Sequence, residues 1–305
     1  MSDFSELKSI IKGTVMFDVP MRDYTSMRVG GSCSCMIIPE DLEDILRFVE
    51  WSRHNDERYF VMGAGTNIIV RDGGIRQPVI RIKNTFNSIS ITDENSSSVK
   101  LIVGAGTPLA ELVRYCGERG LSGIEPLAGI PGTVGGAIRM NAGTKYGSIS
   151  DIVETVSFVE RTGRVKTLGK NDMEFGYREC KQLSSSSIVV SAVLNLNKSD
   201  KNKLQERIAF ILKEKAQTQP LNYPSCGSIF KNPPKVKAWQ LLDEAGMRGV
   251  RVRGAKYSEL HTNFIVNIGD ARAEDVLALI DAGMEKVKEK SKVKLELEVV
   301  IIGEQ

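Results

Sequence analysis

One stretch of the chain, Gly123–Gly143, restricts most strongly what the sequence can fold into. It reads G-I-E-P-L-A-G-I-P-G-T-V-G-G-A-I-R-M-N-A-G and contains six glycines and two prolines. Pro126 and Pro131 fix φ and have no N–H, whereas glycine permits positive φ and lets a ligand approach the backbone closely. The stretch has neither a helical nor an alternating apolar period, so a long surface loop is one interpretation.

The apolar residues of this stretch favour a second interpretation. A solvated loop is polar, and aliphatic side chains of the kind found here are usually buried. They are Ile124, Leu127, Ile130, Val134, Ile138 and Met140. A segment that is irregular, rich in glycine and buried is suited to wrapping a large ligand. We therefore expect Gly123–Gly143 to form the bed of a cofactor.

Composition excludes several classes of protein. A length of 305 residues suggests about two domains, and the formal net charge of +3 is spread along the chain, so nucleic acid is not expected as a partner. The N-terminus lacks the pattern of a signal peptide, and no apolar run is long enough to span a membrane. Five cysteines without paired spacing fit reduced thiols in a cytoplasmic protein. With His54 and His261 as the only histidines, no metal site is expected.

The periodicity of apolar residues predicts many short strands and few helices, which indicates an α+β architecture. A plausible boundary lies at Thr218-Gln219-Pro220, after a helix whose inward face contains Leu204, Ile208, Ile211 and Leu212. One expected helix starts at Pro39-Glu40-Asp41, and a second starts at Pro108, after Thr107 as its N-cap, and stops at Gly120. Three further helices are expected at 199–217, 238–246 and 274–289. The expected strands cover 31–38, 59–62, 68–70, 79–82, 99–103, 152–160, 164–168, 187–196, 263–268 and 293–302.

A second glycine-containing segment, Gly63-Ala64-Gly65-Thr66-Asn67, follows the strand at 59–62. Successive N–H groups in such a turn can form an anion-binding nest, to which Thr66 and Asn67 add donors. A simple tight turn is an equally good interpretation of these five residues alone. Together with the bed at Gly123–Gly143, the turn predicts a site for the pyrophosphate of a dinucleotide.

Three further positions carry side chains that could take part in chemistry. Ser228 lies on a constrained turn, C-G-S-I-F-K-N-P, although a capped turn explains the pattern as well. Arg178 follows Phe175-Gly176-Tyr177 and would need an anionic partner if buried, such as a substrate carboxylate. Glu296 and Glu298 share one face of the last expected strand, either at an exposed edge or in a site. A nucleophilic role for Ser228 is disfavoured because histidine is scarce.

The ordered set of these motifs resembles the UDP-N-acetylenolpyruvoylglucosamine reductase family, in its shorter subtype. The motifs are G-A-G-T-N-I-I-V, G-I-E-P-L-A-G-I-P-G-T-V-G-G-A with M-N-A-G, F-G-Y-R, G-S-I-F-K-N-P, H-T-N-F-I-V-N and E-V-V-I-I-G. The resemblance covers nearly the whole chain. It implies an α+β fold of the vanillyl-alcohol-oxidase type, in which two subdomains hold FAD and a smaller domain binds substrate.

The implied domains are residues 1–83, completed by a C-terminal strand at 293–305, then 84–217, and a substrate-binding domain at 218–292. The resemblance also implies NADPH as co-substrate, non-covalent FAD, a UDP-sugar substrate, and a cytoplasmic monomer that makes a peptidoglycan precursor. The residues that it places at FAD are Gly63, Ala64, Gly65, Thr66, Asn67, Ile68, Pro131, Gly132, Gly135, Gly136, Asn141 and Gly143.

The resemblance implies three catalytic residues. Hydride transfer to C3 of an enolpyruvyl group leaves negative charge at C2 and on the carboxylate. Arg178 is suited to hold that charge, which is worth roughly 3–4 kcal/mol if it matches an oxyanion-hole donor. Ser228 is the proton donor to C2, and Glu298 orients or polarises the site, although the sequence alone does not prefer it over Glu296.

The remaining implied roles concern substrate. Lys231 and Asn232 face the UDP-sugar, and His261 and Asn263 line the same cleft. One departure from the family pattern is Cys180, where serine is common, which leaves one supporting contact in doubt. Two alternatives stay open, namely another FAD oxidoreductase of this fold that oxidises an alcohol or hydroxy acid, and a flavin-free module that binds a nucleotide sugar.

Overall fold

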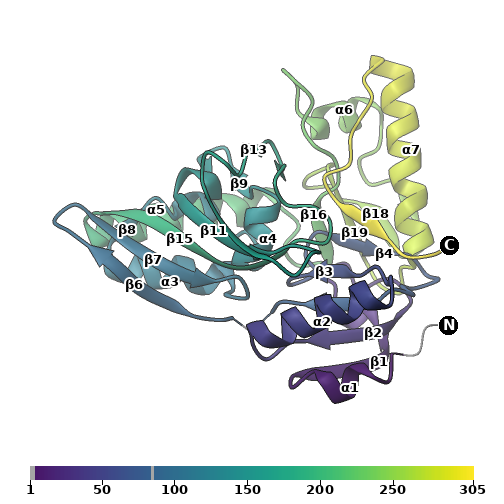
Figure 1. Ribbon diagram of the computed structural model, residues 1–305. Coiled ribbons are helices and arrows are strands. Elements are labelled where there is room, and N and C mark those ends of the chain that lie inside the picture. The colour runs from purple at the N-terminus through teal and green to yellow at the C-terminus, as the bar shows by residue number, and fades with distance from the viewer. Residues whose placement is uncertain (1–3, 84–85) are drawn as a thin grey trace. The chain divides into compact units, whose positions relative to one another are not determined.

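The computed structural model (Figure 1) describes residues 4–83 and 86–305. These residues form two compact units. Unit 1 comprises the residues up to Phe17, Cys35–Ala64 and Gln77–Lys213, and unit 2 comprises Asp18–Ser34, Gly65–Arg76 and Glu214–Gln305. The division into three domains that the sequence suggested stays a prediction. Residues 1–3, where we expected no signal peptide, lie outside the described part, as do residues 84 and 85.

The first sheet of unit 1 has the strand order β1-β2-β5-β3. Strand β5 pairs in parallel with both β2 and β3, so these three strands run in the same direction. Strands that run in the same direction need crossover connections, and α2 lies in the connection from β2 to β3. Asp41 caps α2 by accepting the N–H of Asp44, so the helix begins directly after the expected start at Pro39-Glu40-Asp41. The bounds are α1 Leu7–Ile10, β1 Thr14–Pro20, β2 Ser32–Ile38, α2 Leu42–His54, β3 Phe60–Met62 and β5 Val79–Arg81, with β1 and β2 contributing residues to both units.

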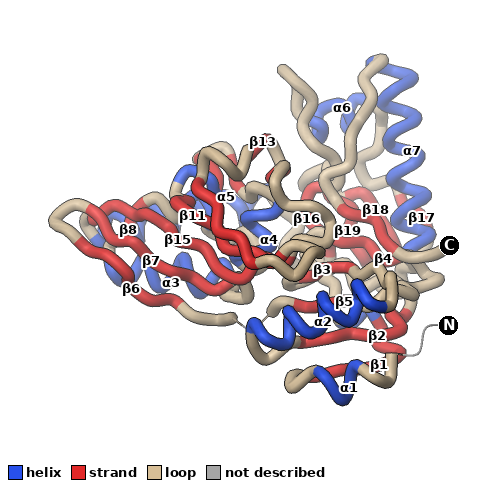
Figure 2. Tube along the Cα trace, in the orientation of Figure 1, coloured by secondary structure: helices blue, strands red, loops and turns tan. Residues whose placement is uncertain are grey.

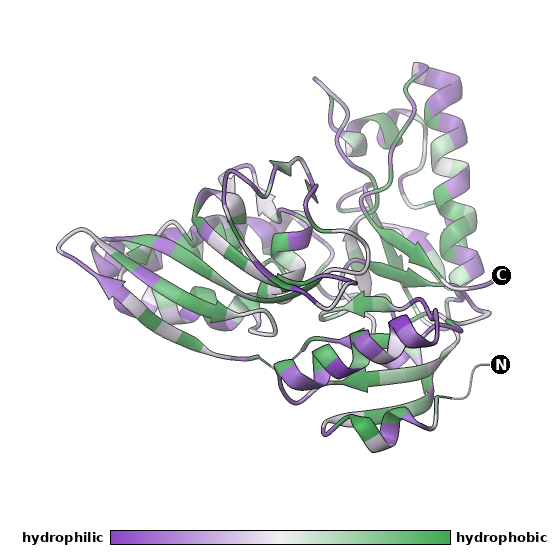
Figure 3. Cartoon of the chain, viewed as in Figure 1, coloured by the Kyte–Doolittle hydropathy of each residue, from purple (hydrophilic) through white to green (hydrophobic). Residues whose placement is uncertain are grey.

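A larger antiparallel sheet of unit 1 has the order β12-β11-β15-β7-β6, with β8 paired to β15 (Figure 2). Apolar and polar residues alternate along much of its strands (Figure 3). Successive side chains of a strand point to opposite faces, so Leu101 and Val103 are buried while Ile102 between them, although apolar, is exposed. Helix α3 ends at Gly120, whose φ is 66°. The bounds are β6 Ile89–Glu94, β7 Ser98–Gly104, α3 Leu109–Arg119, β8 Leu121–Ser122, β11 Val153–Val159, β12 Val165–Gly169 and β15 Ile188–Lys198.

The glycine-rich stretch in unit 1 folds into short elements rather than an open loop. Ile124, Leu127, Val134 and Ile138 are buried, whereas Ile130 is only partly buried. The elements of this region are η2 Glu125–Leu127, α4 Val134–Arg139, β9 Gly143–Thr144, β10 Gly147–Ser148, η3 Ile149–Asp151, β13 Phe175–Gly176 and β14 Glu179–Cys180.

Unit 2 contains an antiparallel sheet of order β16-β19-β18-β17 together with helices α6 and α7. The hydroxyl of Tyr257 donates to the carbonyl of Leu279 at 3.0 Å, and a Cβ on Gly283 would lie 2.3 Å from that hydroxyl, so glycine permits this packing of α7. The bounds are η1 Met21–Asp23, β4 Ile68–Val70, α5 Lys201–Thr218, β16 Ser225–Ser228, α6 Ala238–Glu244, β17 Arg251–Val252, β18 Ala255–Tyr257, β19 Phe264–Asn267, α7 Ala273–Ser291 and β20 Val300–Ile302, with α5 beginning in unit 1.

Three local predictions were wrong. The expected strand at 293–302 is reduced to β20, which pairs in parallel with β4, because the residues before it pair only through an isolated bridge at Leu297. Leu212 is 44% exposed, since the buried stripe of α5 runs through Leu204 and Ile211. Pro108 rather than Thr107 occupies the N-cap position of α3, which has no side-chain cap, because the hydroxyl of Thr107 donates to Ser88 and its carbonyl accepts the N–H of Val134.

Candidate active site

Ser228 is the last residue of β16 and pairs with Phe264 of β19. The register slips between Ser225 and Ser228, and Gly227 within this bulge has a φ of 79°. A Cβ on Gly227 would meet no atom within 4 Å, so the backbone conformation rather than lack of space requires glycine there. Bulges re-aim side chains at functional sites, and Ser228 is left half-buried at the end of the strand.

Asn263 fixes the segment that follows Ser228. Its Nδ2 donates to the carbonyl of Phe230 at 2.8 Å, and its Oδ1 accepts the N–H of Phe230 at 3.0 Å. Its main-chain oxygen also accepts the N–H of Ile229 at 2.9 Å. Because Asn263 is only 3% exposed, these bonds are sheltered from water. The amide therefore acts in the described structure as a clamp on the serine segment.

The C-terminal segment pairs with the residues after Ser228. Lys231 donates its N–H to the carbonyl of Glu296, and the N–H of Glu298 donates to the carbonyl of Ile229, both at 2.8 Å. This antiparallel pairing brings the serine and Glu298 onto adjacent chain segments. Glu298 is half-buried whereas Glu296 is exposed, which separates two residues that the sequence left equivalent.

Asn67 ties the turn that starts at Gly63 to this segment. Its Nδ2 donates to the carbonyl of Glu298 at 3.0 Å, and its carbonyl accepts the N–H of Val300 at 3.0 Å. Asn67, the last residue of the predicted turn, and the predicted catalytic segment therefore meet within unit 2. The other predicted substrate residues lie nearby in sequence: Lys231 is half-buried, and Asn232 is exposed and accepts the N–H of Ala238 at the start of α6.

Arg178 belongs to unit 1, where it occupies the two-residue turn between β13 and β14. Its φ is 59°, an unusual value for a residue with a side chain. The Nη2 of Arg178 donates to the carbonyl of Gly143 at 3.1 Å. Cys180 follows in β14, where its buried Sγ contacts the carbonyl of Met173 at 3.2 Å, and burial raises the pKa of the thiol.

The glycine bed shows where a cofactor can approach. Helix α4 begins directly after its N-cap Thr133, a residue not among those predicted although threonine before V-G-G is a cap signal. The N–H groups of Val134, Gly135 and Gly136 donate to Thr107, Ala105 and Thr133. These first-turn donors are thus used by the protein itself.

Close approach to this backbone remains possible. A Cβ on Gly136 would meet only the Oγ1 of Thr133, at 3.5 Å, so the space beside this glycine is not filled by the described residues. Gly132, with a φ of 143°, precedes α4, and Pro131 precedes it in turn. The residues therefore fit a flat or extended cofactor that lies against bare backbone.

The Gly65 turn lies in unit 2. Gly65 is buried with a φ of 71°, and a Cβ there would lie 2.2 Å from the carbonyl oxygen of Tyr24. The N–H of Ser26 donates to the carbonyl of Gly65 at 3.0 Å. The segment Tyr24–Ser26 therefore packs directly on this turn.

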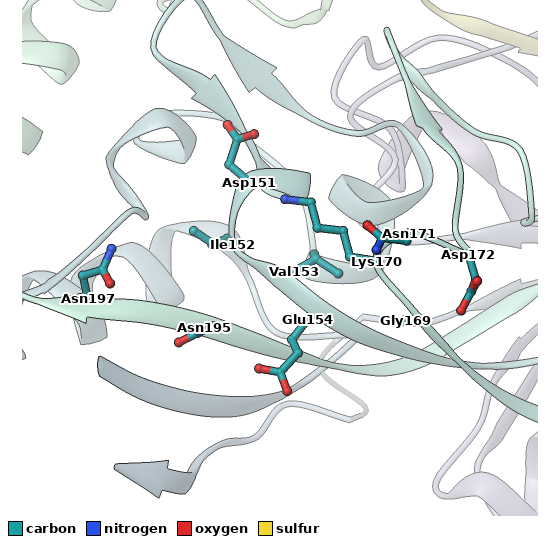
Figure 4. A pocket seen from close by; sticks show the side chains of 10 residues that line it. All are labelled: Asp151, Ile152, Val153, Glu154, Gly169, Lys170, Asn171, Asp172, Asn195 and Asn197. Atoms are coloured by element: carbon teal, nitrogen blue, oxygen red, sulfur yellow. The ribbon is translucent and has the colours of Figure 1, made fainter. Parts of the chain in front are cut away.

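A polar cavity of about 660 Å³ in unit 1 contains none of the predicted site residues. Glu154 of β11 and Asn195 of β15 lie on its wall with Lys170 and Asp172 (Figure 4). Glu154 is paired with Lys100 at 2.8 Å.

None of the helices described is long and apolar enough to cross a membrane.

Comparison with known proteins decides the family. Residues 33–169 match the model of an FAD binding domain, and residues 219–302 match that of the UDP-N-acetylenolpyruvoylglucosamine reductase C-terminal domain. The reductase of Syntrophus aciditrophicus is 38% identical over 98% of this chain and 95% of its own, and that of Geobacter metallireducens is 38% identical over 99% and 98%. The chain belongs to the UDP-N-acetylenolpyruvoylglucosamine reductase family.

A solved structure of this family agrees with the fold. The UDP-N-acetylenolpyruvylglucosamine reductase of Thermus caldophilus superposes with a TM-score of 0.81 at 35% identity, over 96% of this chain and all of that one. The predicted family and α+β FAD-binding fold of the vanillyl-alcohol-oxidase type are confirmed. As a member of this reductase family, the chain is an oxidoreductase with FAD as cofactor and NADPH as co-substrate. The individual site residues stay predictions.

Proposed function

We propose that the chain reduces UDP-N-acetylglucosamine enolpyruvate to UDP-N-acetylmuramate, a step of peptidoglycan precursor synthesis. The proposal draws on the relatives named for this reduction and on one structural observation. That observation is the pairing of Ile229–Lys231 with Glu296–Glu298, which places a hydroxyl and a carboxylate from distant parts of the sequence on adjacent segments. Bound FAD supplies the redox chemistry by accepting hydride from NADPH and delivering it to C3 of the enolpyruvyl group.

Ser228 has the role of proton donor in this proposal. Once C3 has received hydride, negative charge develops at C2 and on the adjoining carboxylate. A carbanion-like carbon is a strong base, so even a weakly acidic hydroxyl can protonate it. The bulge at Gly227 and the clamp by Asn263 fix the main chain on either side of Ser228, which lowers the entropy cost of presenting its hydroxyl for proton transfer.

Two charged residues support this step. The guanidinium of Arg178 stabilises the charge on the substrate carboxylate, and removing such a donor commonly costs about 3–4 kcal/mol of transition-state stabilisation. Glu298 orients the reacting group from the segment beside Ser228. Gly63–Ile68 and the bed Pro131–Gly143 hold FAD, while Lys231 and Asn232 bind the UDP-sugar.

The two half-reactions separate these roles. In anaerobic stopped-flow absorption, NADPH should bleach the flavin of Ser228→Ala at the native rate. Reoxidation of the reduced flavin by UDP-N-acetylglucosamine enolpyruvate should slow by orders of magnitude, because only this half-reaction needs the proton. Ser225→Ala, three residues earlier in β16, is the matched control and should reoxidise normally.

Glu298→Gln and Glu296→Gln form a second matched pair on one segment. The proposal requires a large loss of reoxidation rate in Glu298→Gln and little change in Glu296→Gln.

Equal loss of both half-reactions in Ser228→Ala would give the serine a structural role instead. Bleaching of the native flavin by an alcohol, with no response to the enolpyruvyl substrate, would refute the proposed function itself.

A further inference from the structure

Two buried hydroxyls in unit 2 have no hydrogen-bond partner among the described residues. They are the Oγ1 of Thr25 and the Oγ of Ser26. Thr25 is only 6% exposed. Leaving a buried hydroxyl unsatisfied costs stability, so such groups in a native protein call for an explanation. Two adjacent ones indicate a polar ligand that the polypeptide does not provide.

The two hydroxyls belong to the segment that packs on the Gly65 turn. The Cα of Thr25 lies 3.2 Å from the position that a Cβ of Gly65 would take, and Ser26 donates its N–H to the carbonyl of Gly65. The main-chain N–H of Gly65 itself donates to no main-chain carbonyl within residues 4–83 and 86–305. An N–H without a main-chain acceptor in a tight glycine turn, with two hydroxyls without partners on the segment beside it, provides the kind of donors that bind phosphate oxygens.

The first turn of α4, within the Gly123–Gly143 bed, does not provide free N–H donors for the same phosphate oxygens. The N–H groups of Val134, Gly135 and Gly136 are all bonded to protein oxygens. A diphosphate carries charged oxygens that require donors. The donors available at the Gly65 turn are therefore the ones suited to it.

We propose that Thr25 and Ser26 donate hydrogen bonds from their hydroxyls to the diphosphate of the flavin cofactor. Both residues precede residues 33–169, which match the FAD binding domain, so the cofactor site extends beyond that domain. This inference rests on the proposed role of the Gly65 turn in holding FAD.

The test measures apo-protein stability and FAD affinity in the same variants. Thr25→Val replaces the hydroxyl with a methyl group of similar size. Its apo-protein should unfold at the same or a higher urea concentration, because a buried unsatisfied group has been removed. Its FAD dissociation constant, from quenching of flavin fluorescence, should rise about tenfold or more, as expected when a hydrogen bond to a charged group is lost.

Two variants control for packing. Thr25→Ser keeps the hydroxyl and should retain native FAD affinity even if loss of the methyl lowers stability. Ser52→Ala removes a buried hydroxyl that already donates to the carbonyl of Glu57 at 2.6 Å, so it should lower stability without changing FAD affinity. Ser26→Ala should behave as Thr25→Val does, and the double variant should lose more affinity than either.

Riboflavin, which has no phosphate, identifies the part of the cofactor that is bound. Its affinity should be the same in native protein and in Thr25→Val. An equal loss for FAD and riboflavin, or unchanged FAD affinity in the double variant, would overturn the inference while leaving the proposed function intact. A native protein that binds no FAD would instead overturn the proposed function.

Discussion

The Nδ2 of Asn141 donates a hydrogen bond of 2.8 Å to the carbonyl of Gly176, in the hairpin whose turn contains Arg178. The Oδ1 of the same side chain accepts the N–H of Ser150 at 3.3 Å. Two residues further on, the carbonyl of Gly143 accepts the guanidinium of Arg178. The chain after α4 therefore holds the arginine hairpin at two points.

Asparagine at position 141 serves the backbone as well as the hairpin. Asn141 has a φ of 40° at the C-terminus of α4, where Ala142 donates its N–H to the carbonyl of Ala137 at 2.8 Å. This is the arrangement in which glycine is usual and asparagine is the next most frequent choice. Glycine would satisfy the backbone, whereas only asparagine also provides both side-chain bonds.

Asn141→Gly should consequently preserve the helix end while loosening the hairpin. We expect a stability loss of about 1–2 kcal/mol from two hydrogen bonds, retained flavin, and a turnover number at least about tenfold lower. Asn141→Asp keeps an acceptor for Ser150 but sets a carboxylate against the carbonyl of Gly176, so its turnover should fall further. The separate cofactor role predicted for Asn141 would be favoured if flavin were lost in step with turnover.

Gly63 and Thr133 should show strong coupling. A Cβ on Gly63 would lie 2.6 Å from the Oγ1 of Thr133, the cap of α4, so Gly63→Ala should cost about 1–3 kcal/mol. Thr133→Ala should cost about 1 kcal/mol through loss of the cap, but it also removes the clashing oxygen. In urea unfolding the double variant should therefore lose at least about 0.5 kcal/mol less than the sum of the single losses.

A second glycine variant controls for backbone effects in this cycle. The Cβ of Gly169→Ala would meet only Asp172, at 3.6 Å, which is ordinary contact, and a change within about 0.5 kcal/mol is expected. Additive losses at Gly63 and Thr133 would mean that the clash is relieved by backbone movement instead.

Local elements were predictable because their signals are local. The start of α2 after Asp41, the stop at Gly120 and the α6 stop at Gly246, with a φ of 75°, each depend on residues within one turn of the helix end. The strand at 293–302 failed for the opposite reason. Its apolar residues pack in the core of unit 2, yet their hydrogen-bond partners are set by Ile229–Lys231, far away in the sequence.

The candidate site divides in the same way. The residue types of the serine motif and of the glycine segments could be read directly, and family resemblance gave them roles. The choice of Glu298 over Glu296 needed their burial, since alternation puts both on one face. Thr25 and Ser26 could not be found from sequence, because only the absence of partners for their buried oxygens distinguishes them from other hydroxyls.

The five cysteines should be unreactive in the native protein. All are buried, and burial raises the pKa of Cys33 to about 11 and that of Cys116 and Cys226 to about 12. Because the thiolate is the reactive form, a thiol-specific chromogenic reagent at pH 8 should label none quickly and all five after unfolding. Ser96→Cys, at an exposed position, should add one fast site. Rapid native labelling at Cys226 would contradict this arrangement.

His261 should make stability depend on pH. Its ring packs edge-on against Phe264 at 4.9 Å between centroids, and its Nδ1 is buried with no partner among the residues described. Burial lowers the pKa of His261 below its usual value near 6.5, although Asp243 acts in the opposite direction. The native state therefore binds fewer protons than the unfolded state as the pH falls below about 6.5.

Because the native state binds fewer protons, lowering the pH decreases the free energy of unfolding. Stability contributed by neutral His261 is fully present above the unfolded pKa and is lost as the pH falls from about 6.5 towards the lower folded pKa. His261→Gln cannot gain this proton, so the free energy of unfolding of native protein minus that of the variant should decrease between pH 7 and pH 5. Urea unfolding at several pH values measures the difference, with a substitution of the exposed His54 as comparison. A difference that is constant with pH would mean that His261 titrates alike in the folded and unfolded chains.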